Sequence, residues 1–267
     1  MSKSTQPNQL LCIFKENTLK TLLKTCTFIA ILFAFSCNSS DEEPFIQQFN
    51  CLPTALQNGV VAFYPFNNGS LDDVSGNNYN LTNTTSATSG MDRAGNPNCA
   101  YQFNHSNNEF LKYINPTFLD NLPVNNLSIS FWYKSNDDIG GYGMFICRDD
   151  YIACTNYSRG EWSVGFSNGF LITHFPNGGL SYLGIGNIVN TNWQHVVITS
   201  NNTDNQMYLN GILLSSGIDS YSCPIFNQGD LFIGKFYNGL IDDIIIYNRV
   251  VTPSEVSELY NLNACCN

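Results

Sequence analysis

The sequence predicts an all-β protein built as an antiparallel β-sandwich, and three observations lead to that fold class. About a dozen short runs, rich in β-branched and aromatic residues, are separated by clusters of Gly, Asn, Asp and Ser. No run with helical periodicity lies between two of them, which argues against a parallel α/β fold. Charged residues make up only 12% of the 267-residue chain, a composition typical of a turn-rich β protein outside the cytoplasm.

The expected strands begin at residue 60. The run 60–66 is the first strand, and the Asn-, Asp- and Gly-rich stretch 67–78 after it is a loop. The run 127–133 alternates cleanly, so its two serines and Trp132 should share one face while its larger apolar residues share the other. Further strands are expected at 101–103, 110–114, 144–147, 151–154, 162–166, 170–175, 193–199, 206–209, 212–214 and 231–234.

Turn and cap signals connect these strands. The Asn-Gly pairs at 168–169 and 210–211 are strong hairpin signals. After the last strand, Thr252 can cap a helix, Pro253 suits its first position, and Glu255 completes a capping box. The sequence therefore predicts a short C-terminal helix of about two turns.

The stretch 236–249 is expected to be a strand buried on both faces. Successive strand residues point to opposite faces, and each face here is apolar except for one carboxylate, Asp242 or Asp243. A buried carboxylate is costly unless it is hydrogen-bonded, paired or bound to a metal. This strand therefore needs a further layer on each side and a partner for each acid.

The N-terminal region has the pattern of a secretion signal. Lysines precede an uncharged run, 25–36, which is too short to span a bilayer and has the form of a signal-peptide hydrophobic region. The run ends in Ala-Phe-Ser before Cys37, which resembles a bacterial lipobox, and the polar, acidic stretch that follows resembles the tether of Bacteroidota surface lipoproteins. The expected divisions are a signal peptide at 1–36, a tether at 37–56 and a β-sandwich at 57–267.

A lipid on Cys37 would anchor the protein in the outer membrane of a Gram-negative bacterium, at the cell surface. The alternative is an ordinary secretory signal that is cleaved nearby. The region before the lysines is long, which leaves open a true start codon downstream of Met1.

Charge and cysteine content restrict the partners and the compartment. Removing residues 1–36 takes away four lysines and one glutamate, so the net charge changes from −10 to −13. A surface this acidic repels nucleic acid, which is not an expected partner. Ten cysteines without zinc-ligand spacing favour disulfides in an oxidising compartment, and Cys147–Cys154 would close a hairpin.

Several stretches together resemble one family, the laminin-G-like (LamG, pentraxin-like) domains of the concanavalin A-like lectin/glucanase superfamily. Any single stretch is weak, but their order and spacing cover nearly all of residues 57–262. The resemblance implies a jelly-roll β-sandwich whose two ends are neighbours. The matching stretches are 59–66 with 73–77, 127–132, 193–197, 207–211, 232–234 and 238–255.

Because the ends are expected to be neighbours, Cys51 should pair with Cys265 or Cys266. Cys99 and Cys223 are then left without an assigned partner. These pairings follow from the implied fold and not from the cysteine spacing.

The same resemblance brings the first loop near the stretch 236–249. A structural calcium ion could then bridge Asp73 and Asn77 to Asp242 or Asp243, since hard cations prefer oxygen ligands. The alternative is that each carboxylate accepts backbone N–H groups and orders its loop without a metal.

Binding is the expected function, and no catalytic residues are expected. No paired-carboxylate glycosidase pattern occurs, and adjacent Asp242 and Asp243 should face opposite ways. His195 is interpreted as a packed strand residue and not as a base. Lectins of this type stack sugars on exposed aromatic side chains, for which the candidates are Tyr142, Tyr151, Tyr157, Trp162 and Tyr182.

The expected role is therefore a cell-surface binding or adhesion module for carbohydrate. The first alternative is a protein-interaction or structural subunit of an envelope complex, which would use a cell-surface protein as its partner. The second alternative is a glycan-cleaving hydrolase or lyase.

Overall fold

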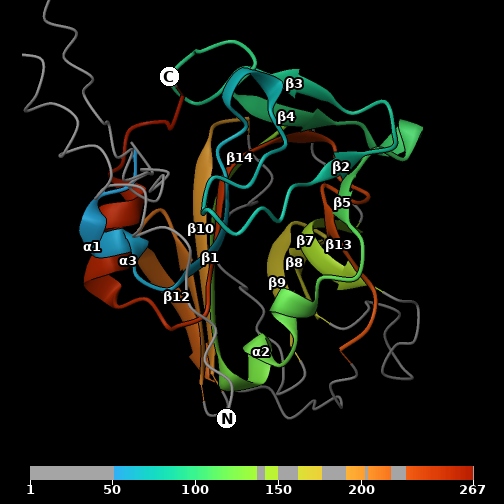
Figure 1. Ribbon diagram of the computed structural model, residues 1–267. Coiled ribbons are helices and arrows are strands. Elements are labelled where there is room, and N and C mark those ends of the chain that lie inside the picture. Colours follow the sequence, from blue (N-terminus) through green and yellow to red (C-terminus); the bar gives the residue numbers. More distant parts are fainter. Residues whose placement is uncertain are drawn as a thin grey trace, which may run out of the picture. The chain divides into compact units, whose positions relative to one another are not determined.

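Two antiparallel β-sheets packed face to face make up the computed structural model (Figure 1). The structure describes residues 51–136, 142–149, 162–175, 191–201, 204–217 and 227–266. All of these lie in one compact unit, Ile46–Asn267. The predicted antiparallel sandwich is thereby confirmed.

The first sheet has eight strands among the described residues, in the order β12-β11-β10-β6-β14-β4-β3, and β1 also pairs with β14. Strands far apart in the sequence are therefore neighbours at its centre, where β14 lies between β6 and β4 and also pairs with β1. Its strands are β1 (Val60–Tyr64), β3 (Thr88–Gly90), β4 (Ala100–Phe103), β6 (Asn126–Ser135), β10 (Gln194–Asn201), β11 (Asn205–Leu209), β12 (Ile212–Gly217) and β14 (Gly239–Tyr247).

The second sheet has six strands in the described part of the chain, in the order β2-β5-β13-β7-β8-β9. Within it, the predicted Asn-Gly hairpin joins β8 to β9, and Asn168 and Gly169 both have positive φ angles. Its strands are β2 (Thr82–Asn83), β5 (Leu111–Tyr113), β7 (Tyr142–Asp149), β8 (Trp162–Ser167), β9 (Phe170–His174) and β13 (Asp230–Ile233).

Short helices lie outside the sheets. The predicted C-terminal helix is confirmed as α3 (Pro253–Tyr260), and Thr252 and Glu255 form the expected capping box. Helices α1 (Thr54–Gln57) and α2 (Leu122–Asn125) and the 3₁₀ turns η1 (Asn67–Gly69), η2 (His105–Asn107) and η3 (Thr117–Leu119) were not predicted. Each has three or four residues, too few for a periodic pattern to appear.

The main hydrophobic core lies between the two sheets. The alternation predicted for β6 is confirmed, because Leu127, Ile129, Phe131 and Tyr133 all belong to this core. A second apolar cluster lies on the other face of the eight-stranded sheet, where α1 and α3 cover it (Figure 1). We call this the outer face, and it carries Ser128, Ser130 and Trp132.

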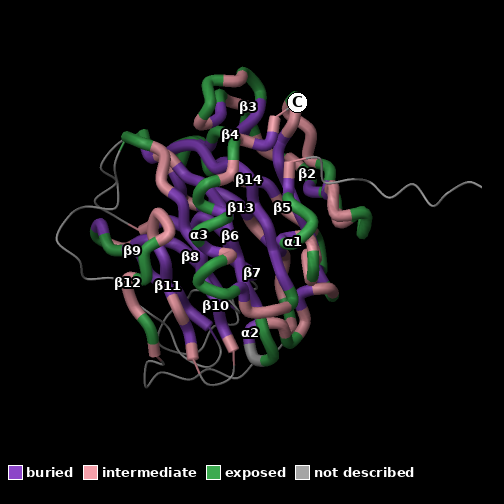
Figure 2. The backbone as a smooth tube through the Cα atoms, turned by 90° about the vertical axis from the view of Figure 1, so that its left-hand side faces the viewer, coloured by how far each residue is buried: buried purple, intermediate pink, exposed green. Residues whose placement is uncertain are grey.

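Strand β14 is buried along its whole length, as predicted, but it does not alternate regularly (Figure 2). Its register shifts between Asp242 and Ile245, and Asp243 has a φ of 48°. A bulge of this kind adds a residue to one strand and re-aims the side chains around it. The prediction that Asp242 and Asp243 face opposite ways is wrong, because both carboxylates contact the same guanidinium group.

The folded body begins before the predicted boundary at residue 57. Leu52 and Leu56 are 3% and 0% exposed and pack in the outer apolar cluster, so residues 51–56 are not tether. The predicted signal peptide, the earlier part of the tether and Cys37 lie outside the described residues. Within the described ranges, no helix is long and apolar enough to cross a membrane.

Candidate functional site

Asp73 organises the loop after β1 by accepting four hydrogen bonds. Its Oδ1 accepts from the backbone N–H groups of Phe63 and Ser75, both at 2.9 Å. Its Oδ2 accepts from the Ser75 hydroxyl at 2.7 Å and from Tyr79 N at 3.1 Å. Asn77 donates from Nδ2 to a β1 carbonyl at 2.9 Å. The donors to Asp73 engage both of its carboxylate oxygens and order the loop around it.

Asp242 and Asp243 share Arg93 as their cationic partner. Arg93 Nη1 donates to Asp243 Oδ2 and lies 3.5 Å from Asp242 Oδ2. Asp242 Oδ1 also accepts from the backbone N–H of Asp243 at 2.7 Å. Burial raises the pKa of both carboxyl groups, and the Arg93 charge opposes that rise.

Arg93 also holds the segment that follows α3. We call residues 261–266 the C-terminal segment. Arg93 Nη2 donates to the carbonyls of Leu262 and Asn263 at 3.2 and 2.7 Å. The backbone N–H of Cys265 donates to Asp243 Oδ2 at 3.3 Å. The Arg93 guanidinium group therefore connects the loop between β3 and β4 with β14 and with the C-terminal segment.

Two disulfides tie the same segment to the body. Cys51–Cys265 is one of the two pairs that the implied fold left open, and Cys99 pairs with the other candidate, Cys266. Cys147 is buried in β7, whereas its predicted partner Cys154 and Cys223 lie outside the described residues.

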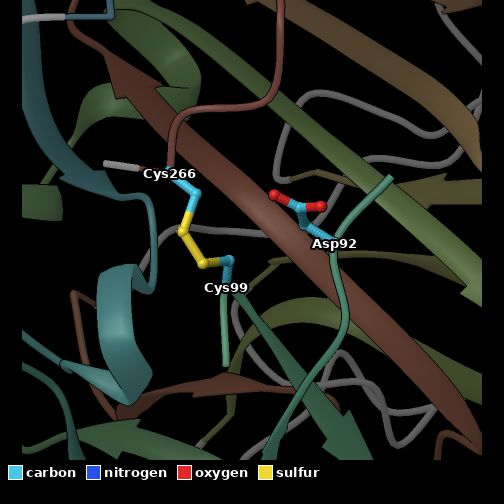
Figure 3. Close-up of side chains that lie close together, drawn as sticks. All are labelled: Asp92, Cys99 and Cys266. Carbon is cyan, nitrogen blue, oxygen red and sulfur yellow. A yellow bond between two sulfur atoms is a disulfide. The ribbon is translucent and has the colours of Figure 1, made fainter. Parts of the chain in front are cut away.

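Asp92 lies beside the Cys99–Cys266 disulfide (Figure 3). In the described parts of the chain, this is the one group of at least three Asp, Glu, His or Cys side chains close enough to share a metal ion. Both sulfurs are used in the disulfide, and Asp92 Oδ1 accepts from Ala94 N and Asn96 N. These side chains therefore serve the fold, because the sulfurs form a disulfide and Asp92 orders its own loop.

The calcium site expected at Asp73, Asn77, Asp242 and Asp243 does not fit this geometry. The three carboxylates do not come together as one metal-binding group among the described residues. Calcium requires six to eight oxygen ligands. The Asp73 oxygens are taken by N–H and O–H donors, and Arg93 occupies the position beside Asp242 and Asp243 where a cation would bind.

On the outer face, Ser130 and His195 form a buried pair. Ser130 Oγ lies 2.9 Å from His195 Nε2, and the two residues are 2% and 1% exposed. Burial, and then the Arg93 charge, lower the pKa of His195 to about 3, so the imidazole is neutral. Trp132 packs against His195 with ring centroids 5.0 Å apart.

The predicted ligand-binding aromatic residues are not one group. Trp162 is fully buried in the core between the sheets and stacks on Phe175 with centroids 6.2 Å apart. It is therefore not a ligand contact. Tyr142, at the start of β7, is half-buried, and Tyr151, Tyr157 and Tyr182 lie outside the described residues.

Tyr142 belongs to a cluster of aromatic side chains at one end of the six-stranded sheet. Phe236 is half-buried, and its ring centroid lies 6.4 Å from that of Tyr142 and 5.9 Å from that of the exposed His105. The Lys235 ammonium lies 4.3 Å from the Phe232 ring centroid and 5.5 Å from that of Phe236. We define the aromatic cluster as His105, Phe110, Tyr142, Phe232, Lys235 and Phe236.

The backbone of Phe236 is strained. Its φ is 59°, in a region that bulky side chains rarely adopt and that costs about 1–3 kcal/mol. The preceding residue is fixed, because Lys235 O accepts from Met144 N at 2.8 Å. The strand pairing therefore holds Phe236 in a conformation that presents its ring within the cluster.

A family model described as the concanavalin A-like lectin/glucanases superfamily matches residues 111–257, more than half of the chain. The chain belongs to this superfamily. The resemblance seen in the sequence is thereby confirmed, and no curated protein sequence matches the chain.

Solved structures with the superfamily fold include binding domains of other proteins. The botulinum neurotoxin type C structure, from a toxin that interacts with two ganglioside molecules, has a TM-score of 0.62 at 16% identity over 78% of this chain. The binding domain of botulinum neurotoxin DC, in complex with rat synaptotagmin II, has a TM-score of 0.60 at 18% identity over 77%. This chain spans about half the length of these toxin domains, 52% in both cases.

A third structure matches along nearly its whole length. Domain 4 of AbnA, an extracellular GH43 arabinanase from Geobacillus stearothermophilus, was solved in complex with arabinotriose. Its TM-score is 0.57 at 20% identity, over 76% of this chain and 98% of that domain. At these identities, the TM-scores show a shared fold and nothing more.

Sequence reasoning missed Arg93, Ser130 and Phe236. One signal could have pointed to Arg93: a buried acid pair needs a cation, and after residue 36 the chain has only four arginines and three lysines. No sequence signal marks Phe236, because its strain and its neighbours arise from strand pairing.

Proposed function

We propose that the protein is a non-catalytic module that binds carbohydrate at the aromatic cluster. The observation that carries this proposal is the set of half-exposed rings around Phe236. A sugar ring offers an apolar face and a rim of hydroxyl groups, and rigid aromatic side chains provide contact area at low entropic cost. His105 is exposed beside Phe236 and can supply a hydrogen bond to a hydroxyl group.

Two further points support this reading. Backbone strain is found disproportionately at functional sites, and Phe236 is strained where an Asn or Gly would not be. The fold is shared with a domain that was solved with arabinotriose and with a toxin that interacts with gangliosides. Carbohydrate is thus the ligand class common to these neighbours.

The state of the carboxylates supports a non-catalytic role. A retaining glycosidase needs two carboxyl groups about 5–5.5 Å apart on either side of the sugar. The buried acids described here serve the fold: Asp242 and Asp243 pair with Arg93, Asp73 orders its loop, and Glu109 accepts from Ser86 Oγ and Asn104 N. Turnover of a polysaccharide panel, abolished by a single carboxylate substitution, would overturn this part of the proposal.

We place this module at the cell surface, anchored by a lipid on Cys37. The signal-like leader, the lipobox-like sequence before Cys37 and the acidic stretch after it support that location. Mass spectrometry of the protein extracted from membranes should find the N-terminus at an acylated Cys37. An unmodified N-terminus elsewhere would contradict the anchor.

Phe236→Asn tests the ligand site and separates binding from folding. Asn tolerates a positive φ, so relief of strain should offset the lost packing and keep the melting temperature close to that of the wild type. On a glycan panel, the affinity of any bound glycan should fall at least about tenfold. The matched control is Phe170→Ala, an aromatic side chain in β9 of the same sheet that is 36% exposed and should not affect binding.

A protein partner is the second candidate, and one surface favours it. Ile212 and Leu213 are 67% and 48% exposed on β12, which is an edge strand of the eight-stranded sheet among the described residues. An exposed apolar edge strand can pair with a strand from another chain. If Leu213→Lys abolishes binding to cell surfaces while Phe236→Asn has no effect, the protein-binding reading replaces the carbohydrate one.

A further inference from the structure

A small cavity separates the outer face of the eight-stranded sheet from the C-terminal segment. Its volume is about 20 Å³, and a cavity needs about 10–15 Å³ to hold one water molecule. There is thus room for one water molecule. The polar side chains that line the cavity are Arg93, Ser130, His195, Asp243 and Asn263.

Two residues that line the cavity each have one side-chain atom without a hydrogen-bond partner among the described residues. These atoms are His195 Nδ1 and Asp243 Oδ1, both shielded from solvent. The other atoms of these groups are occupied, since His195 Nε2 pairs with Ser130 and Asp243 Oδ2 pairs with Arg93. A buried polar atom without a partner loses its hydration and gains nothing in return, so two such atoms beside one cavity require an explanation.

We propose that one water molecule occupies this cavity and joins His195 Nδ1 to Asp243 Oδ1. A water satisfies both atoms in either tautomer of the imidazole. If Nδ1 carries the proton, it donates to the water, which donates to Asp243. If Nε2 carries the proton and donates to Ser130, the water donates to both Nδ1 and Asp243.

The cavity suits a water better than a metal ion. The Arg93 guanidinium already contacts Asp243 and lies 4.5 Å from the Trp132 ring centroid, so a second cation would be repelled. Much of the remaining wall is apolar and includes Leu52, Ile245 and Leu259. Among the lining residues, only Ser130, Asp243 and Asn263 have side-chain oxygen atoms, too few to replace the hydration shell of a metal ion.

The water completes a network of hydrogen bonds across three adjacent strands. This network connects Ser130 in β6, His195 in β10, the water and Asp243 in β14. Arg93 extends the network to the carbonyls of the C-terminal segment. This buried site lies in a different sheet from the aromatic cluster, so it stands whether or not carbohydrate binds there.

Crystal structures at a resolution that shows ordered water test the proposal. In the disulfide-bonded wild type, we expect one water peak within about 3.2 Å of both His195 Nδ1 and Asp243 Oδ1. An empty cavity, or an ion recognised by its anomalous signal or by more than four ligands, would overturn it.

Two variants make the test specific. Ser130→Ala removes the partner of Nε2 but neither atom that holds the water, so the peak should remain. His195→Phe removes Nδ1, so the peak should disappear or weaken strongly. A peak that persists unchanged in His195→Phe would contradict the assigned bonds, and if that variant does not fold, the wild type and Ser130→Ala still decide the matter.

Discussion

Arg93 and Asp243 lie 150 positions apart in the chain and form a buried ion pair, in which Nη1 donates to Oδ2. Their side chains are 10% and 9% exposed. The same guanidinium also contacts Asp242 and two carbonyls of the C-terminal segment. Within the part of the chain that the structure describes, Arg93 therefore joins β14 to the C-terminal segment.

Arg93→Ala should strongly destabilise the protein. The substitution leaves two adjacent buried carboxylates and two carbonyls without their donor, and breaking a buried ion pair costs about 3–5 kcal/mol. Urea unfolding would measure the loss. The control is Arg249→Ala, which breaks a more exposed pair with Glu255 and should cost clearly less. Equal losses in the two variants would contradict the central role of Arg93.

Asp242→Asn should stabilise the protein at neutral pH. Burial, and then the Asp243 charge, raise the pKa of Asp242 well above 3.8. The carboxyl proton of Asp242 is therefore bound more tightly in the folded state than in the unfolded state. The wild-type protein loses stability as the pH rises from about 3.8 through the folded-state pKa, because a buried carboxylate forms. Asn is neutral at every pH, so the variant should be more stable than the wild type at neutral pH and equally stable at about pH 4. Urea unfolding at both pH values checks this prediction. A variant that is less stable than the wild type at neutral pH would refute it.

His195 should make the protein sensitive to acid. Its folded-state pKa is lowered to about 3, so stability that is fully present above the unfolded value of 6.5 is lost as the pH falls between these two values. His195→Gln lacks this group. The stability difference between wild type and variant should therefore shrink as the pH falls below 6.5. A difference that does not change with pH would show that the imidazole is not buried in its neutral form.

Both disulfides should form, and each should stabilise the fold. The pairs close loops of 214 and 167 residues, and removing a native disulfide typically costs about 2–5 kcal/mol. Peptide mapping without reduction should link the Cys51 and Cys99 peptides to the C-terminal peptide. In the double variant Cys99→Ser/Cys266→Ser, the Cys51–Cys265 link should persist and the melting temperature should fall. A Cys51–Cys99 link would contradict the structure.

Calcium should not change the stability of the protein. A ligand that binds only the folded state raises the melting temperature, but Asp73, Asp242 and Asp243 are engaged by protein donors and do not come together. Melting curves with calcium and with chelator should therefore coincide. If calcium raised the melting temperature and Asp73→Ala or Asp243→Ala removed the effect, the bridging site expected from the sequence would be restored.

Much of the fold could be predicted because its signals are local. Alternation in β6 placed its large apolar residues in the core, Asn-Gly pairs marked two hairpins, and residues 252–255 marked the start of α3. The two-residue strand β2 and three-residue strand β3 were missed, because so few residues show no period. The orientation of Asp243 was predicted wrongly, since a bulge interrupts the alternation without a Gly or Pro to mark it.

The sequence by itself determined the sandwich, the burial of β14 and the need of its two acids for partners, since burial pattern and charge are properties of each segment. Only the tertiary structure decided which residues are the partners of these two acids. Arg93, the two disulfides, the Ser130–His195 pair and the aromatic cluster around Phe236 all depend on which distant segments become neighbours. That choice depends on strand order and register across the whole sheet, which no local stretch of sequence encodes.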